Sequence, residues 1–166
     1  MMRFVGTALL SGALVLTGVG VAGAQAPVDT CKSADLSIAV GEVSAAAGTV
    51  HREVLFTNRG AGSCVLRGFP GVSYVDSNGN QIGKAAERFG ARGPLVTLTR
   101  GGTAVSDVGF AQAGNFDPDV CDITPVWGLQ VFPPDETEPL HLGLLGQYGC
   151  AGDVDQLSVA TVQSWS

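Results

Sequence analysis

The chain shows short runs in which apolar and polar residues alternate, and almost no run with helical spacing. Leu36, Ile38 and Val40 alternate with small or polar residues, and Val54 and Phe56 do the same further along. A period of two places the apolar side chains on one face of a strand, whereas a helix needs a period near 3.6. The pattern therefore predicts a chain built from strands.

Turn-forming residues bound these runs, because 24 glycines and 8 prolines are spread along 166 residues. Asn78-Gly79 predicts a type I′ hairpin, and Gly68-Phe69-Pro70-Gly71 predicts a tight turn with a structural role. We expect a loop at 114–122 and at most one helical turn at 85–93. About eight or nine short strands are expected, drawn from residues 36–41, 51–57, 64–66, 72–75, 81–83, 94–98, 103–110, 127–132, 140–142 and 156–162.

Many short strands with frequent turns are typical of an all-β sandwich or barrel. We expect a two-sheet antiparallel sandwich that is immunoglobulin-like only in a loose sense. Trp127 follows Cys121, and Tyr148 precedes Cys150 by two residues, an order that immunoglobulin domains share. The two cysteines are too close in sequence to cross between two sheets by the usual route, so a true immunoglobulin domain is excluded.

The N-terminus has the pattern of an export signal over residues 1–24. Arg3 precedes an apolar stretch, and Ala22-Gly23-Ala24 is a small-x-small cleavage site, so we expect cleavage after Ala24. The alternative is an uncleaved membrane anchor, which the glycines and threonines of the stretch and the cleavage site disfavour. Cleavage would leave a short leader at 25–30 and a single domain at 31–166, with no membrane span.

Four cysteines in an exported chain predict two disulfides, for which three pairings are possible. We expect Cys31 to pair with Cys64 and Cys121 with Cys150, because each pair then closes one half of the domain. A zinc site is the alternative. It is disfavoured because the chain has no C-x-x-C motif and no cysteine close to a histidine.

Acidic residues dominate the charge, with 15 Asp and Glu against 9 Lys and Arg and a formal net charge of −6. Every charged residue after Arg100 is acidic. Nucleic acid is therefore not an expected partner. The acidic C-terminal part is expected to be either an ordinary solvated surface or a face that binds cations or a partner.

Several segments together resemble a known family. They are LFTNRGAGSCVLRGFPGVSYVD at 55–76, LVTLTRGGTAVSDV at 95–108, Cys121, and LQVFPPDETEPL at 129–140 before Cys150. In this order they resemble the actinobacterial family called domain of unknown function 4232. The resemblance implies an exported or envelope-attached β-sandwich with two disulfides, and it implies no catalytic residues. Lipoprotein members of the family carry a lipobox cysteine that this chain lacks, so we expect no lipid anchor.

Oxygen-rich and cationic clusters are the candidates for ligand binding, and no cofactor is expected. Asp117, Asp119 and Asp122 have a spacing that could gather ligands for a weak calcium site. The Ca²⁺-loop likeness of residues 76–80 is better explained by turn chemistry, because the glycine and the glutamate of such a loop are missing. Arg88, Arg92 and Arg100 flank the least regular segment and could form a face that recognises anions.

No G-x-S-x-G, S-x-x-K or H-E-x-x-H motif is present, and His51 and His141 are expected at the surface. We therefore expect an exported binding or structural module of the cell envelope that is not an enzyme. Its expected partner is an envelope polymer or another exported protein. Two alternatives stay open: an enzyme or enzyme-associated domain with a site assembled from distant residues, and a weak calcium-binding module.

Overall fold

The computed structural model describes residues 28–165, so the expected signal peptide at 1–24 lies outside the described residues. No helix in the described part is long and apolar enough to cross a membrane. In chain order the elements are η1 (Ser33–Asp35), β1 (Leu36–Ala46), β2 (Thr49–Asn58), β3 (Cys64–Leu66), β4 (Gly71–Val75), β5 (Gln81–Ile82), β6 (Glu87–Phe89), β7 (Val96–Leu98), β8 (Thr103–Ala111), η2 (Ala113–Asn115), α1 (Pro118–Cys121), β9 (Ile123–Phe132), β10 (Leu140–Cys150), β11 (Leu157–Ala160) and β12 (Gln163–Ser164).

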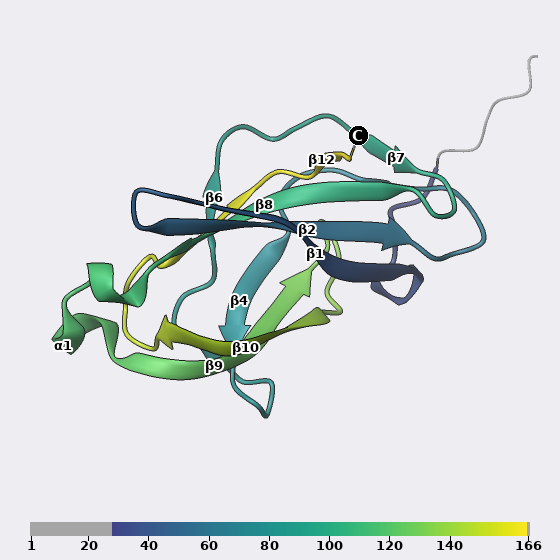
Figure 1. Ribbon diagram of the computed structural model, residues 1–166. Coiled ribbons are helices and arrows are strands. Elements are labelled where there is room, and N and C mark those ends of the chain that lie inside the picture. Colours follow the sequence, from purple (N-terminus) through teal and green to yellow (C-terminus); the bar gives the residue numbers. More distant parts are fainter. Residues whose placement is uncertain (1–27, 166) are drawn as a thin grey trace, which may run out of the picture.

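Two sheets form the layers of a sandwich (Figure 1). The first has the order β1-β2-β8-β11-β6, with β12 paired to β8, and the second has the order β10-β9-β4-β5. A third, small sheet joins β3 to β7. The expected all-β sandwich is confirmed. The described residues hold 12 strands, more than the eight or nine expected. The short strands β6 and β12 lie outside the predicted ranges, because they form only through pairing with β11 and β8.

The core lies between the layers and follows the predicted alternation. Val54 and Phe56 of β2 are at most 1% exposed, and so are Leu129 and Val131 of β9 on the facing sheet. Burying one such side chain stabilises the fold by roughly 1.5 to 3 kcal/mol. The core therefore fixes which face of each strand points inward, and the opposite face is left for other contacts.

Two irregular segments differ from the sequence-based expectation. Residues 85–93 contain the edge strand β6 in place of a helical turn, and β6 runs parallel to β11. The expected loop at 114–122 contains α1, whose N-cap Asp117 accepts a hydrogen bond from the Asp119 backbone N–H at 2.9 Å. Both elements depend on contacts that alternation does not reveal, namely a distant strand and a local cap.

The β4–β5 hairpin returns antiparallel as predicted, but its turn is not type I′. That turn requires a positive φ at both central residues, and only Gly79 of the Asn78-Gly79 pair has one. Asp76 Oδ1 accepts hydrogen bonds from the backbone N–H groups of Asn78 and Asn80. Hydrogen bonds from Asn80 and then Asn78 hold the pKa of Asp76 below its ordinary range. The Asp76 carboxylate thus organises its own turn.

Both predicted disulfides are present, Cys31–Cys64 and Cys121–Cys150. All four cysteines are paired, so none is a zinc ligand. Trp127 and Tyr148 are exposed rather than buried against a disulfide, which agrees with the exclusion of a true immunoglobulin domain.

Candidate anion-binding site

The turn at 68–71 is anchored to the C-terminal part of the chain. Gly68 has a φ of 110°, which favours glycine strongly. Its carbonyl oxygen accepts hydrogen bonds from the Val162 backbone N–H at 2.8 Å and from Thr161 Oγ1 at 3.0 Å. The turn is therefore a fixed platform, and its structural role is the one expected from Gly and Pro.

Three arginines converge on this platform. Arg67, Arg88 and Arg92 line a hollow of about 250 Å³, together with Gly68, Phe69, Pro134 and Asp135; we call it the arginine hollow. The guanidinium of Arg88 lies 5.9 Å from the centroid of the Phe69 ring, a cation–π distance. Arg92 Nη2 donates to the Arg67 carbonyl oxygen at 3.3 Å, so the Arg92 guanidinium also lies beside the turn.

One carboxylate accompanies the three guanidinium groups. Asp135 Oδ2 lies 3.7 Å from Arg92 Nη2, and both side chains are more than half exposed. Such an exposed ion pair is weak. With three arginines and one carboxylate the lining is net positive, although the whole chain is acidic. Guanidinium forks match the oxygens of phosphate and carboxylate groups, so the arginine hollow is suited to hold an anionic group.

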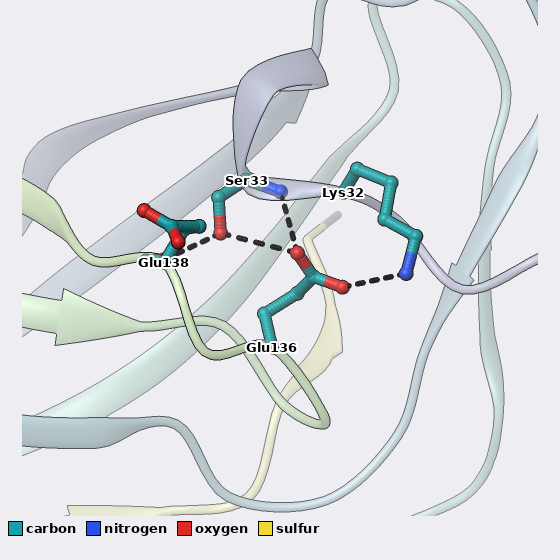
Figure 2. Close-up of polar contacts among 4 residues, drawn as sticks. All are labelled: Lys32, Ser33, Glu136 and Glu138. Carbon is teal, nitrogen blue, oxygen red and sulfur yellow. Dashed lines mark hydrogen bonds and ion pairs between the residues drawn. The ribbon is translucent and has the colours of Figure 1, made fainter.

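Pro134 and Asp135 of the arginine hollow belong to the β9–β10 loop. The same loop contacts Lys32 and Ser33 through Glu136 and Glu138 (Figure 2). Lys32 Nζ donates to Glu136 Oε1 at 2.8 Å, and the Ser33 backbone N–H donates to Glu136 Oε2 at 3.2 Å. Ser33 Oγ also donates to the Glu138 carbonyl oxygen at 2.6 Å. These contacts tie the β9–β10 loop to the residues that follow Cys31, and so they position one side of the arginine hollow.

The same contacts shift two pKa values. The hydrogen bond from Lys32, and after it the one from the Ser33 backbone, lowers the pKa of the Glu136 carboxyl below its ordinary value of 4.5. The hydrogen bond to Glu136 raises the pKa of Lys32. Glu136 is therefore charged at neutral pH and holds the loop as an anion.

Two of the three arginines singled out by sequence belong to the arginine hollow. Arg100 does not line it and lies in the exposed turn between β7 and β8. Arg67, which was not singled out, takes that place because it immediately precedes the turn at 68–71. Nearness in sequence to Arg88 and Arg92 did not indicate which third arginine lies with them. The reason is that β6, which contains Arg88, is brought to the turn by its pairing with β11.

The acidic candidates are not gathered around a common point. Asp117 caps α1, Asp119 donates its backbone N–H to that cap, and Asp122 has left-handed backbone geometry at the end of α1. Within residues 28–165 no three His, Cys, Asp or Glu side chains are grouped so that they could hold a metal ion. Nothing in this arrangement favours calcium binding over the helix-capping role.

The histidines lie apart from the arginine hollow. His51 Nδ1 and Asp107 Oδ2 are 2.7 Å apart on the outer side of the larger sheet, and both side chains are more than a third exposed. His141 is exposed on β10, as predicted. The His51–Asp107 contact was not predicted from the sequence, because the pairing of β2 with β8 creates it.

Comparison with known proteins gives one match. No curated protein and no solved structure matches the chain. Residues 31–166 match the family described as Domain of unknown function (DUF4232), and this match covers most of the 166 residues. The chain therefore belongs to the family Domain of unknown function (DUF4232).

Proposed function

We propose that this chain is an exported binding module of the cell envelope, without catalytic activity of its own, which holds an anionic group in the arginine hollow. Export is supported by the signal pattern at 1–24 and by the two disulfides, which persist in oxidising compartments. The expected actinobacterial origin rests on the sequence resemblance, and it would place the module in an envelope rich in anionic polymers.

The observation that carries the proposal is the convergence of Arg67, Arg88 and Arg92 on one rigid turn. Arginine is the residue best suited to bind phosphate groups, and a hollow with several guanidinium groups suits a polymer with repeated phosphodiesters. The proposed ligand is therefore a phosphodiester-linked envelope polymer. The acidic remainder of the chain would confine such a polymer to this one face.

A binding role is supported over catalysis by the setting of the polar groups. The His51–Asp107 pair is open to solvent, where a general base gains little from its surroundings. The arginine hollow contains no histidine, serine or cysteine that could act as a nucleophile or base. Its lining offers charge and shape for recognition.

The test is retention of the purified protein on isolated phosphodiester wall polymer at low and high ionic strength. The double variant Arg88→Ala and Arg92→Ala should lose at least about tenfold in affinity, since two charge-assisted contacts are removed. The matched control is Arg59→Ala with Arg100→Ala, which removes the same charge from exposed positions outside the hollow. Equal losses in both variants would mean that net charge alone drives binding and would overturn the site.

Export is tested separately by N-terminal sequencing of the protein recovered outside the cells that make it. A mature chain that begins at Gln25 is the expected result. Recovery of the protein only inside the cell, with residues 1–24 still attached, would contradict the export part of the proposal.

A further inference from the structure

The outer side of the larger sheet carries an apolar pair of side chains. Leu55 of β2 and Val105 of β8 are directly opposite each other in the register of the two strands. Their neighbours along these strands, Val54, Phe56 and Ala104, are at most 1% exposed in the core. By alternation the pair points to the opposite, outer side, where an antiparallel sheet usually presents polar residues to solvent. Leu55 and Val105 thus form an apolar floor on this side of the sheet.

Trp165 is held beside this floor by the pairing of β12 with β8. Gln163 lies opposite Val105, and the Trp165 backbone N–H donates to the Thr103 carbonyl oxygen at 3.4 Å. Tryptophan is highly buried on average, yet Trp165 is 55% exposed. It belongs to the lining of a hollow of about 400 Å³, which we call the tryptophan hollow and which is formed by Gly41, Glu42, Glu53, Leu55, Val105, Ser164 and Trp165. An accessible indole ring therefore lines a space large enough for a small ligand.

Two carboxylates in the same lining are not balanced by a cation. Glu42 and Glu53 form no ion pair within residues 28–165, and the residues that line the tryptophan hollow include no lysine, arginine or histidine. Glu53 Oε2 accepts a hydrogen bond from the Glu42 backbone N–H at 3.1 Å. This N–H belongs to the bulge of β1 between Val40 and Val43, where the pairing with β2 shifts register. The bulge therefore brings both acidic residues to the hollow that contains the indole ring.

Gly41 keeps the space between the Glu53 carboxylate and the floor open. A Cβ at this position would lie 2.7 Å from Glu53 Oε2 and 3.1 Å from Leu55 Cδ2. A glycine inside a strand often marks a place where another group approaches the backbone closely. Here it lets the Glu53 carboxylate lie against β1, next to the apolar floor. Negative charge and apolar surface are therefore adjacent within one hollow.

We propose that the tryptophan hollow binds an alkylated ammonium group, whose charge faces Glu42 and Glu53 and whose methyl groups pack against Trp165. Tryptophan is the best aromatic partner for a cation, and quaternary ammonium ligands are recognised in this way. A metal ion fits less well, because it needs several oxygen ligands, and within residues 28–165 no three His, Cys, Asp or Glu side chains are grouped to hold one. The site is independent of the proposed function, since it shares no lining residue with the arginine hollow.

The experiment is an NMR titration of the isotope-labelled protein with choline chloride, with dimethylbutanol and with calcium chloride. Dimethylbutanol is the neutral analogue of choline, with carbon in place of nitrogen. Choline should shift the indole N–H signal of Trp165 and the backbone signals of Glu42 and Glu53, and dimethylbutanol should bind at least about tenfold more weakly. An unchanged Trp165 signal, or equal binding of choline and its neutral analogue, would overturn the proposal. Calcium that shifts the two glutamates at lower concentration than choline would overturn the assignment to an organic cation.

A charge variant with a matched control tests the carboxylates. Glu53→Gln keeps an oxygen that can accept from the Glu42 backbone N–H but removes the negative charge, so it should weaken choline binding at least about fivefold. Glu87→Gln removes the same charge from an exposed position on β6, outside the hollow, and should leave choline binding unchanged. Equal losses in the two variants would mean that net charge alone attracts choline and would overturn the site.

Two further variants test the ring and the space. Trp165→Leu keeps an apolar side chain without the aromatic face, so choline binding should weaken at least about fivefold while the melting temperature changes little, because Trp165 is exposed. Gly41→Ala leaves every charge in place but adds a methyl group beside the Glu53 carboxylate, and it should weaken binding about threefold or more. The Trp165→Leu result decides the question if Glu53→Gln does not fold, and unchanged choline binding in Trp165→Leu would overturn the proposal.

Discussion

Lys32 and Glu136 are separated by 104 positions in the sequence, yet Lys32 Nζ lies 2.8 Å from Glu136 Oε1. The lysine is largely exposed, whereas the glutamate side chain is only 10% exposed because the loop packs it against the N-terminal segment. Lys32 follows the disulfide-bonded Cys31, and Glu136 follows Asp135 of the arginine hollow. One ion pair therefore connects a covalent crosslink to the wall of the proposed binding site.

The first prediction concerns Glu136→Gln. The variant should lower the free energy of unfolding at pH 7 by about 1 kcal/mol, because it replaces charge-assisted hydrogen bonds with weaker ones. Because folding lowers the pKa of Glu136, its stabilising effect is complete above the ordinary carboxyl pKa of 4.5 and is lost as the pH falls through the lowered value. The wild-type and variant stabilities should therefore converge in acid.

Urea unfolding across the acidic range measures this convergence. The control is Glu138→Gln, because Ser33 contacts the Glu138 backbone and the exposed carboxylate has no partner in the described part of the chain. A stability difference between wild type and Glu136→Gln that stays constant down to pH 2 would contradict the assigned role of the carboxylate.

The second prediction compares the two disulfides. They close loops of similar separation, 33 and 29 positions, so removing either should cost roughly 3 to 4 kcal/mol by loop entropy. Only the removal of Cys31–Cys64 should also weaken polymer binding. Cys31 is adjacent to Lys32 and Ser33, and these two residues hold the β9–β10 loop beside the arginine hollow. Pairs of Cys→Ala substitutions, compared by urea unfolding and by polymer retention, test this difference. Equal losses of binding in the two pairs would mean that the N-terminal segment does not support the arginine hollow.

The elements predicted best from the sequence are strands in which apolar residues occupy every second position. The buried Val54 and Phe56 of β2 are an example, since burial of alternate side chains is a local pattern. The edge strand β6 was missed because all three of its residues are exposed, so its sequence carries no apolar alternation. Its existence depends on a parallel pairing with β11, about 70 residues later.

The candidate site was predicted only in part for the same reason. Arg88 and Arg92 were recognised as a cationic group, but the turn that carries Arg67 joins them only when β6 pairs with β11. Contacts within one strand are thus visible in the sequence, whereas contacts between distant strands depend on the fold.

The third prediction concerns Gly68→Ala. A side chain at a φ of 110° is strained, and a Cβ there would lie 3.2 Å from Arg92 Nε, so we expect a loss of about 1 to 2 kcal/mol and a displaced Arg92. Polymer binding should fall together with stability. Gly62→Ala is the control, because its Cβ would meet nothing within 4 Å. Thermal unfolding of both variants gives the comparison, and a Gly68→Ala protein as stable as wild type would show that the turn tolerates a side chain.

The last prediction concerns Asn58, which lies in the 55–76 segment that contributes to the family resemblance. Asn58 is 1% exposed, and its Nδ2 donates to the carbonyl oxygens of Gly62 and Leu98 at 2.8 and 3.0 Å. Its Oδ1 accepts from the Gly60 backbone N–H at 2.9 Å, so one side chain satisfies two backbone groups of the loop after β2 and one at the end of β7. Asn58→Ala should therefore lower the free energy of unfolding by about 2 to 3 kcal/mol, since these groups lose their partner in the interior.

The control Asn115→Ala removes one exposed hydrogen bond to Gly48 and should cost under about 1 kcal/mol. Urea unfolding of the two variants measures the difference, and equal losses would mean that the buried contacts of Asn58 are replaced by water without penalty.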